Sequence, residues 1–131
     1  HERFGQKAGG HRLLFGLPRL SGQPALIITE GELNAISCWQ VAQTWADVVS
    51  IGSQEGARQA GVLEILKQTA LPYRPIIVWL DERERALMLL DRIAPFNGAA
   101  VWSANGLDAN DLLLRGLLAA RLANAVADLQ S

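Results

Sequence analysis

Several acidic residues of this sequence stand within a few positions after short apolar runs, in segments far apart along the chain. They are Glu30, Glu32, Asp81, Glu82, Glu84 and Asp108. Carboxylates that are held close together repel one another and raise each other's pKa, and a divalent cation relieves that repulsion. Mg²⁺ prefers oxygen ligands and commonly needs only one or two carboxylates plus substrate phosphates. The chemistry expected of such a site is phosphoryl or nucleotidyl transfer, with the metal as Lewis acid.

The same acids also have a purely structural interpretation. Glu32 and Glu84 fall in the first turns of expected helices, and Asp108 stands where an N-cap residue is expected. A carboxylate at a helix N-terminus accepts hydrogen bonds from free N–H groups and interacts favourably with the helix dipole. Helix capping and metal binding are compatible roles, so the sequence leaves both open.

Two arginines and a glycine turn add candidate contacts to phosphate. Arg83 and Arg85 stand among the acids that follow the apolar run 76–80, and a guanidinium is a planar donor that pairs well with phosphate. Gly52 and Ser53 follow another apolar run, where backbone N–H groups would cradle a phosphate. The structural alternatives are that Gly52 only makes the turn and that Ser53 is the N-cap of the next helix.

Short apolar runs alternate with helical patterns four times after residue 24. We predict strands at 25–29, 48–51, 76–80 and 99–102. We predict helices at 32–43, 58–69 and 84–94, and a helical tail from residue 108 that is broken near Gly116. Wholly apolar strands with long helical connections are typical of parallel sheets covered on both faces. The prediction is an α/β domain of about four mainly parallel strands flanked by helices, with ligands bound beyond the carboxyl ends of the strands.

Composition excludes several other classes of protein. The chain has 131 residues, 50% of them hydrophobic, and a formal net charge of −1, which fits one globular domain and no strongly basic nucleic-acid binder. The only histidines are His1 and His11, and the only cysteine is Cys38. The body of the domain therefore lacks the residues for a disulfide framework, a cysteine-rich zinc site or a catalytic centre built on histidine.

The ends of the chain and its cellular location follow from simpler features. Residues 1–23 are rich in glycine, which predicts a linker or the tail of a preceding subdomain, followed by the α/β domain at 24–131. The chain does not begin with Met, so we expect a piece of a longer protein. No apolar run approaches the roughly 20 residues of a membrane span, and no export signal is present. We therefore expect a cytoplasmic protein with no membrane partner.

Four segments, in order along the chain, resemble the motifs of the TOPRIM domain, especially in primases and phage primase-helicases. Residues 27–36 resemble the first motif, and residues 49–53 resemble the second strand with its following glycine. Residues 79–81 resemble the strand that ends in the family's DxD motif, and residues 106–113 are similar to the fourth segment of primase members. The resemblance covers roughly residues 12–116, with each motif at a predicted strand end.

The resemblance implies a compact α/β fold and a DNA primase-like nucleotidyltransferase of DNA replication. It places Glu30 at the family's glutamate, which acts in acid–base or metal chemistry, and Glu32 at a second glutamate of the primase-helicase branch. It places Asp81 at the first acid of DxD and Asp108 at the acid of the fourth segment, with Mg²⁺ or Mn²⁺ as the cofactor. The implied partners are single-stranded DNA, nucleotides and other domains of a larger replication protein.

One residue departs from the family pattern, because Arg83 stands where the motif has its second aspartate. A cation among metal ligands weakens Mg²⁺ binding, since like charges repel. Three accounts stay open: Glu82 or Glu84 replaces the missing ligand, Arg83 binds a substrate phosphate directly, or the site is degenerate. In the last case the domain is a non-catalytic module that binds nucleic acid or protein. A metal-dependent nuclease of the OLD type is a further alternative, which the fourth segment disfavours.

Overall fold

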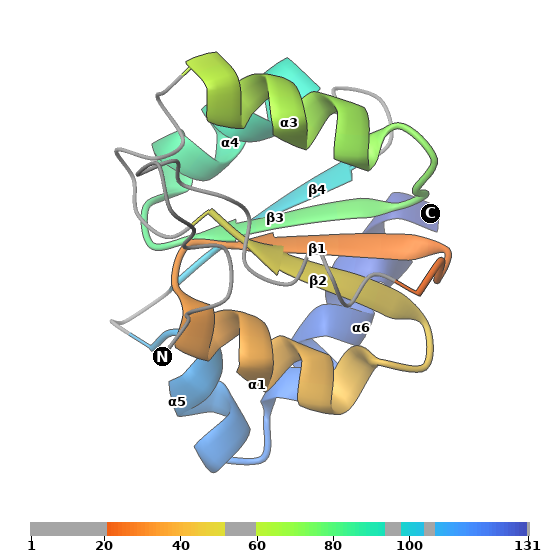
Figure 1. Cartoon of the computed structure of the whole chain (residues 1–131). Helices are drawn as coiled ribbons and strands as arrows, with labels where there is room; N and C mark the ends of the chain where they lie inside the picture. The colour runs from red at the N-terminus through yellow and green to blue at the C-terminus, as the bar shows by residue number, and fades with distance from the viewer. Residues whose placement is uncertain (1–20, 52–59, 94–97, 104–106, 131) are drawn as a thin grey trace, which may run out of the picture.

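The chain forms a four-stranded parallel sheet with helices on both faces (Figure 1). The structure is a computed structural model, and it describes residues 21–51, 60–93, 98–103 and 107–130. The strands are β1 (Ala25–Thr29), β2 (Ala46–Ser50), β3 (Ile76–Leu80) and β4 (Gly98–Trp102). They lie in the order β2-β1-β3-β4, and every neighbouring pair is parallel. This architecture confirms the prediction of an α/β fold with four parallel strands.

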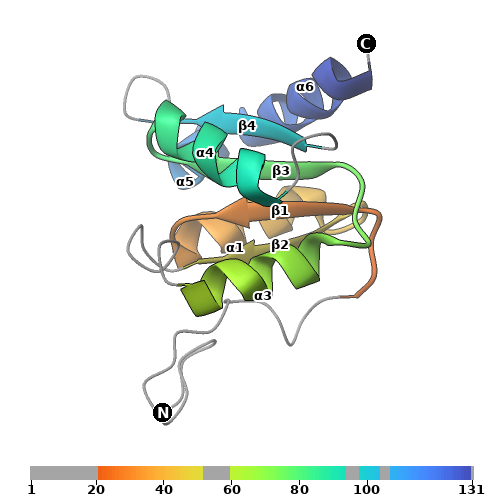
Figure 2. The same ribbon diagram turned by 90° about the horizontal axis from the view of Figure 1, so that it is seen from above.

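The helices divide into two layers, one on each face of the sheet. They are α1 (Glu32–Ala42), α3 (Ala60–Ala70), α4 (Arg83–Ile93), α5 (Ala109–Leu114) and α6 (Leu118–Gln130). Helices α3 and α4 cover one face, and α1, α5 and α6 cover the other (Figure 1). The view in Figure 2 looks onto the α3/α4 layer, with α4 lying over β3 and β4.

Alternate residues of each strand pack into opposite layers of the core. In β1, Ile28 joins the cluster that contains Leu66 of α3, whereas its neighbour Ile27 joins the cluster that contains Cys38 of α1 and Leu122 of α6. Burying one such aliphatic side chain stabilises the fold by about 1.5–3 kcal/mol. Because both faces of the sheet are covered, β3 is wholly apolar and β1 is apolar up to Thr29, and this is why their sequence pattern does not alternate.

The second strand differs from its prediction. It begins at Ala46 rather than residue 48 and includes Asp47, a carboxylate that is only 3% exposed. The Asp47 carboxylate accepts hydrogen bonds from the Tyr73 hydroxyl at 2.7 Å, the Ser21 hydroxyl at 2.9 Å and the Gly22 N–H at 2.9 Å. An acid inside an apolar run argues against a strand, but donors from two other segments make its burial favourable.

The C-terminal helices follow the prediction closely. Asp108 is the N-cap of α5, and Gly116 adopts a positive φ of 75° between α5 and α6, where the break was expected. The apolar side of α6 packs on the sheet through Leu118, Leu122 and Ala125, all of which are buried. Within the described ranges, none of the helices is long and apolar enough to cross a lipid bilayer.

Candidate functional site

The carboxyl ends of β1 and β3 form the switch point of this topology. The chain leaves β1 toward α1 on one face of the sheet, and it leaves β3 toward α4 on the opposite face (Figure 1). Ligands of open parallel sheets bind where neighbouring connections diverge in this way. The residues that follow the two strands are Glu30 and Asp81, so both predicted acids lie at the expected position.

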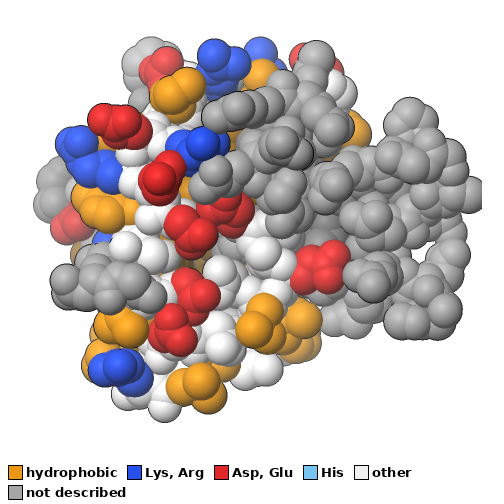
Figure 3. Space-filling view, turned by 90° about the vertical axis from the view of Figure 1, so that its left-hand side faces the viewer, with side chains coloured by type: hydrophobic (Ala, Val, Ile, Leu, Met, Phe, Trp, Pro, Cys, Tyr) orange, Lys and Arg blue, Asp and Glu red, His pale blue; other side chains and the backbone are white. Residues whose placement is uncertain are grey.

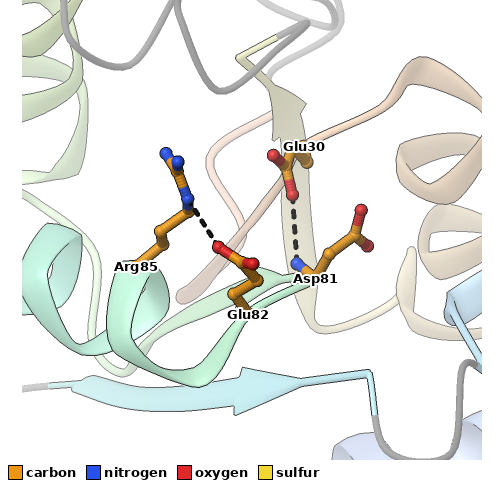
Figure 4. A network of polar contacts seen from close by, with 4 residues as sticks. All are labelled: Glu30, Asp81, Glu82 and Arg85. Carbon is orange, nitrogen blue, oxygen red and sulfur yellow. Dashed lines mark hydrogen bonds and ion pairs between the residues drawn. The ribbon is translucent and has the colours of Figure 1, made fainter.

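Glu30 and Asp81 are in direct contact at this edge. Oε1 of Glu30 accepts a hydrogen bond from the backbone N–H of Asp81 at 3.0 Å (Figure 4). The backbone carbonyl of Glu30 accepts a second bond from the Ser50 hydroxyl at 3.1 Å, which ties the ends of β1 and β2 together. The fold therefore places both acids at the same sheet edge, and their roles in metal binding stay a prediction.

The two acids differ in exposure. Glu30 is 8% exposed, whereas Asp81 is exposed to solvent. Among the residues that the structure describes, no lysine or arginine forms an ion pair with either carboxylate. A recessed carboxylate with no countercharge is unfavourable, and a bound cation removes that cost.

The acids fit one kind of metal site and not another. Across residues 21–51, 60–93, 98–103 and 107–130, no group of three or more His, Cys, Asp or Glu side chains is arranged to hold a metal ion. A closed cage made only of protein ligands is therefore not built there. Two acids at one sheet edge, the recessed Glu30 and the exposed Asp81, suit Mg²⁺, which keeps several waters and takes further oxygens from substrate phosphates.

The charged residues that follow Asp81 are engaged with other partners. Glu82 forms an ion pair with Arg85, with 2.7 Å between Oε1 of Glu82 and Nε of Arg85, and its carboxylate is turned toward that arginine (Figure 4). The guanidinium of Arg83 lies over the ring of Trp102, 5.4 Å from the ring centroid. Arg83 is exposed, and within the described residues no carboxylate pairs with it.

The other predicted site residues are spread around this edge. Glu32 is half-buried in the first turn of α1, and Glu84 is exposed in the first turn of α4. Asp108 accepts a hydrogen bond from the N–H of Asp111 at 2.9 Å, and the Asp111 carboxylate accepts from the N–H of Asp108 at 3.1 Å. This capping box confirms the N-cap interpretation of Asp108.

No hydrogen bond or ion pair in the described part of the chain joins Glu32, Glu84 or Asp108 to the contact between Glu30 and Asp81. A metal-binding or catalytic role for these acids stays a prediction. The predicted phosphate contacts Gly52 and Ser53 lie outside the described residues.

Hydrogen bonds between side chains of α1 and the start of α5 form a polar bridge that the sequence did not predict. The Asn34 side-chain oxygen accepts a hydrogen bond from the N–H of Asn110 at 3.1 Å, and the Ser37 hydroxyl donates to the Asn110 side-chain oxygen at 3.2 Å. The bridge fastens the start of α5 to the helix that follows Glu30. Both asparagines stand within the quoted motif segments, but no spacing rule pairs residues so far apart.

The surface at this edge carries a cluster of negative charge. Figure 3 views the molecule from the left of Figure 1, onto the side toward which the strands point. Acidic side chains gather across the middle of this face, with Lys and Arg side chains beside them. The face therefore presents both signs of charge within a short span.

Comparison with known proteins links this fold to primases. No protein-family model matches the sequence, and no protein of curated function matches it. The structure matches that of the primase fragment of the bacteriophage T7 primase-helicase protein, with a TM-score of 0.66 and 20% identity over 87% of this chain and 48% of that chain.

A second match is to a complex of the bacteriophage T7 lagging-strand DNA polymerase with primase domains of two gp4 subunits, bound to an RNA/DNA hybrid and dTTP. Here the TM-score is 0.61 at 19% identity, over 88% of this chain and 58% of that chain. The chain thus spans about half the length of the chains that it matches. This likeness confirms the fold implied by the TOPRIM resemblance: the chain has the α/β fold of about half of the T7 primase fragment.

Proposed function

We propose that this chain is the TOPRIM-like domain of a DNA primase-like replication protein, supporting Mg²⁺-dependent nucleotidyl or phosphoryl transfer on nucleic acid. The observation that carries the proposal is the contact between Glu30 and Asp81 at the switch point of the sheet. These two acids at one sheet edge have no cationic partner in the described residues, and they carry the negative charge that a Mg²⁺ site requires. The primase-like fold supports the assignment of the reaction class.

The roles of the individual residues follow from their placement. Glu30 and Asp81 would hold Mg²⁺ or Mn²⁺, which when bound polarises a phosphoryl oxygen and offsets the charge that develops in transfer. The Glu30 side chain is recessed and fixed by its hydrogen bond, so it is pre-positioned before any ligand arrives. We assign proton transfer to Glu30 or Glu32, which follows it in the first turn of α1.

The structure favours one of the open accounts of the missing aspartate. Glu82 is paired with Arg85, so it is a poor replacement ligand unless that ion pair opens. Glu84 is exposed in the first turn of α4, and no hydrogen bond or ion pair in the described residues joins it to Glu30 or Asp81. Arg83 is turned to Trp102 and keeps its charge available for a phosphate. We therefore propose that the acid pair binds the metal while Arg83 contacts the substrate.

The proposed partners follow from the structural neighbours. One neighbour contains primase domains bound to an RNA/DNA hybrid and dTTP. By analogy we propose single-stranded DNA and nucleotides as ligands of this chain, and other domains of a larger replication protein as its neighbours.

A non-catalytic nucleic-acid or protein binding module is the alternative function. Two observations favour it: an arginine stands where a metal-binding acid is expected, and the described residues lack a third acid at the site. In that case the acid pair would be a remnant with negligible affinity for metal.

Binding of Mn²⁺ to the chain, followed by electron paramagnetic resonance, separates the two functions. Glu30→Gln and Asp81→Asn remove one ligand charge each and are expected to weaken binding by about tenfold or more, roughly 1.4 kcal/mol. Asp91→Asn is the matched control, because Asp91 is an exposed acid farther along α4. Equal Mn²⁺ binding by the wild type and by Glu30→Gln would refute the metal site and leave the binding module.

A further inference from the structure

Trp102 and Arg83 form a second element of the same edge, beside the acid pair. Trp102 ends β4 and is the register partner of Leu80, the residue that precedes Asp81. Arg83 begins α4, and its guanidinium lies over the Trp102 ring. The cation is thus held on the β4 side of Asp81, whereas Glu30 lies on the β1 side.

The position of Arg83 is not explained by the stability of its helix. A cation in the first turn of a helix opposes the helix dipole, and acids are the residues that stabilise this position. The neighbouring acid Glu82 pairs with Arg85 instead, and no carboxylate of the described residues neutralises Arg83. Its guanidinium instead lies over the ring of Trp102, an arrangement in which a cation is attracted to the aromatic face.

A guanidinium held in this way is suited to bind phosphate. Contact with an aromatic face leaves most of its five N–H donors free for another acceptor. A phosphate accepts two of those donors side by side, which a carboxylate-paired arginine would not offer. Because the Arg83 side chain is exposed, a phosphate reaches it without rearrangement of the core.

We propose that Trp102 is a positioning residue that presents Arg83 to a phosphate of a single-stranded DNA, and that this contact forms without a metal ion. The inference rests on the proposed function and deepens it, because it assigns one anchor of the strand to a place outside the acid pair. A strand bound across this edge would meet the cation at one phosphate and the metal-binding acids at another. In this inference Arg83, which replaces the second aspartate of the motif, binds the substrate.

Binding of the full chain to a fluorescein-labelled oligothymidylate, measured by fluorescence anisotropy in EDTA at several salt concentrations, tests this inference. Arg83→Ala should weaken binding severalfold and lower the slope of log affinity against log salt by about one, the loss of a single phosphate contact. Arg92→Ala is the matched control, since Arg92 is an exposed arginine in the last turn of the same helix. Its salt slope should equal that of the wild type.

The role of Trp102 is read from its coupling to Arg83. Trp102→Leu should reproduce most of the loss seen for Arg83→Ala, and it should add nothing in the Arg83→Ala background. Trp102→Phe keeps an aromatic face and should retain most of the binding. The thermal unfolding midpoint shows whether each variant is folded. If Trp102→Leu does not fold, the comparison of Trp102→Phe with the wild type still tests the role of the aromatic ring.

Three results would overturn the inference. They are absence of binding by the wild type, an unchanged salt slope in Arg83→Ala, and a further loss on adding Trp102→Leu to Arg83→Ala, which would show that the ring itself stacks on bases. The oligonucleotide assay is done in EDTA without a metal ion, whereas the Mn²⁺ assay contains no oligonucleotide. A negative result in the oligonucleotide assay would therefore not refute the metal site. A negative result in the Mn²⁺ assay would likewise not refute the contact between Arg83 and phosphate.

Discussion

The carboxylate of Glu30 accepts a hydrogen bond from the backbone N–H of Asp81 at 3.0 Å, although 51 residues separate the two in the chain. The contact joins the carboxyl ends of β1 and β3, so two acidic residues follow neighbouring strands at the same sheet edge. A nearly buried carboxylate that lacks a cationic partner in the described residues costs stability, and a bound cation would remove that cost. Stability and ligand binding should therefore respond in opposite directions to substitution here.

Glu30→Gln tests whether stability and metal binding respond in opposite directions. The glutamine keeps an oxygen acceptor for the Asp81 N–H and removes the buried charge, so the free energy of unfolding should stay equal or rise by about 1 kcal/mol. Glu30→Ala removes the acceptor and should lower it by about 1–3 kcal/mol. Urea denaturation without metal measures both. Equal destabilisation by the two variants would mean that the charge of Glu30, not only its acceptor oxygen, supports the fold.

Substitutions of Asp108 distinguish its role as a helix cap from a role in metal binding. Asparagine is as good an N-cap as aspartate, so Asp108→Asn should leave the free energy of unfolding within about 0.5 kcal/mol of the wild type. Asp108→Ala should lower it by about 1 kcal/mol, because the N–H of Asp111 loses its acceptor. Loss of Mn²⁺ affinity in the asparagine variant would add a ligand role to the cap. Unchanged affinity would assign Asp108 to the cap alone.

The Asp47 carboxylate predicts a dependence of stability on pH. Burial by itself raises its pKa, but hydrogen bonds from Tyr73, Ser21 and Gly22 outweigh burial and hold the pKa below the usual value of 3.8. A lowered pKa means that the ionised form is favoured in the folded state, so its contribution is full above about pH 4 and is lost as the pH falls through the folded-state pKa.

Asp47→Asn should therefore flatten the fall of stability below about pH 4 and lower the free energy of unfolding at neutral pH by about 2–4 kcal/mol. The exposed acid variant Asp91→Asn should keep the wild-type profile. Denaturation series between acid and neutral pH measure both effects. An Asp47→Asn profile parallel to that of the wild type would show that other acids dominate acid unfolding.

Cys38 should be unreactive in the folded protein. It is fully buried in α1, and burial raises the pKa of its thiol to about 12. Only the thiolate attacks disulfide reagents, so a thiol-exchange reagent at mildly alkaline pH should label the chain only after it is unfolded by denaturant. Rapid labelling of the native protein would mean that α1 opens locally, which its packing on the sheet argues against.

Much of the fold was predictable from local pattern. The runs 25–29 and 76–80 match β1 and β3 residue for residue, because strands buried on both faces leave an unbroken apolar signal. The meeting of Glu30 and Asp81 was also predictable, since parallel strands bring their carboxyl ends to one edge and each acid directly follows its strand. The start of β2 at Ala46 was not, because Asp47 interrupts the apolar pattern that marks a strand.

The interactions beyond local pattern depend on which distant side chains meet. The burial of Asp47 is favourable because Tyr73 and Ser21 donate to it, and the Arg83 guanidinium lies over the ring of Trp102 from another element. The residue types at these positions predict a charge but do not predict its partner. The energy of a buried or paired charge depends on the groups that surround it in space. Composition and spacing therefore established the sheet and its acidic edge, and three-dimensional packing determined which of those charges remain open to a ligand.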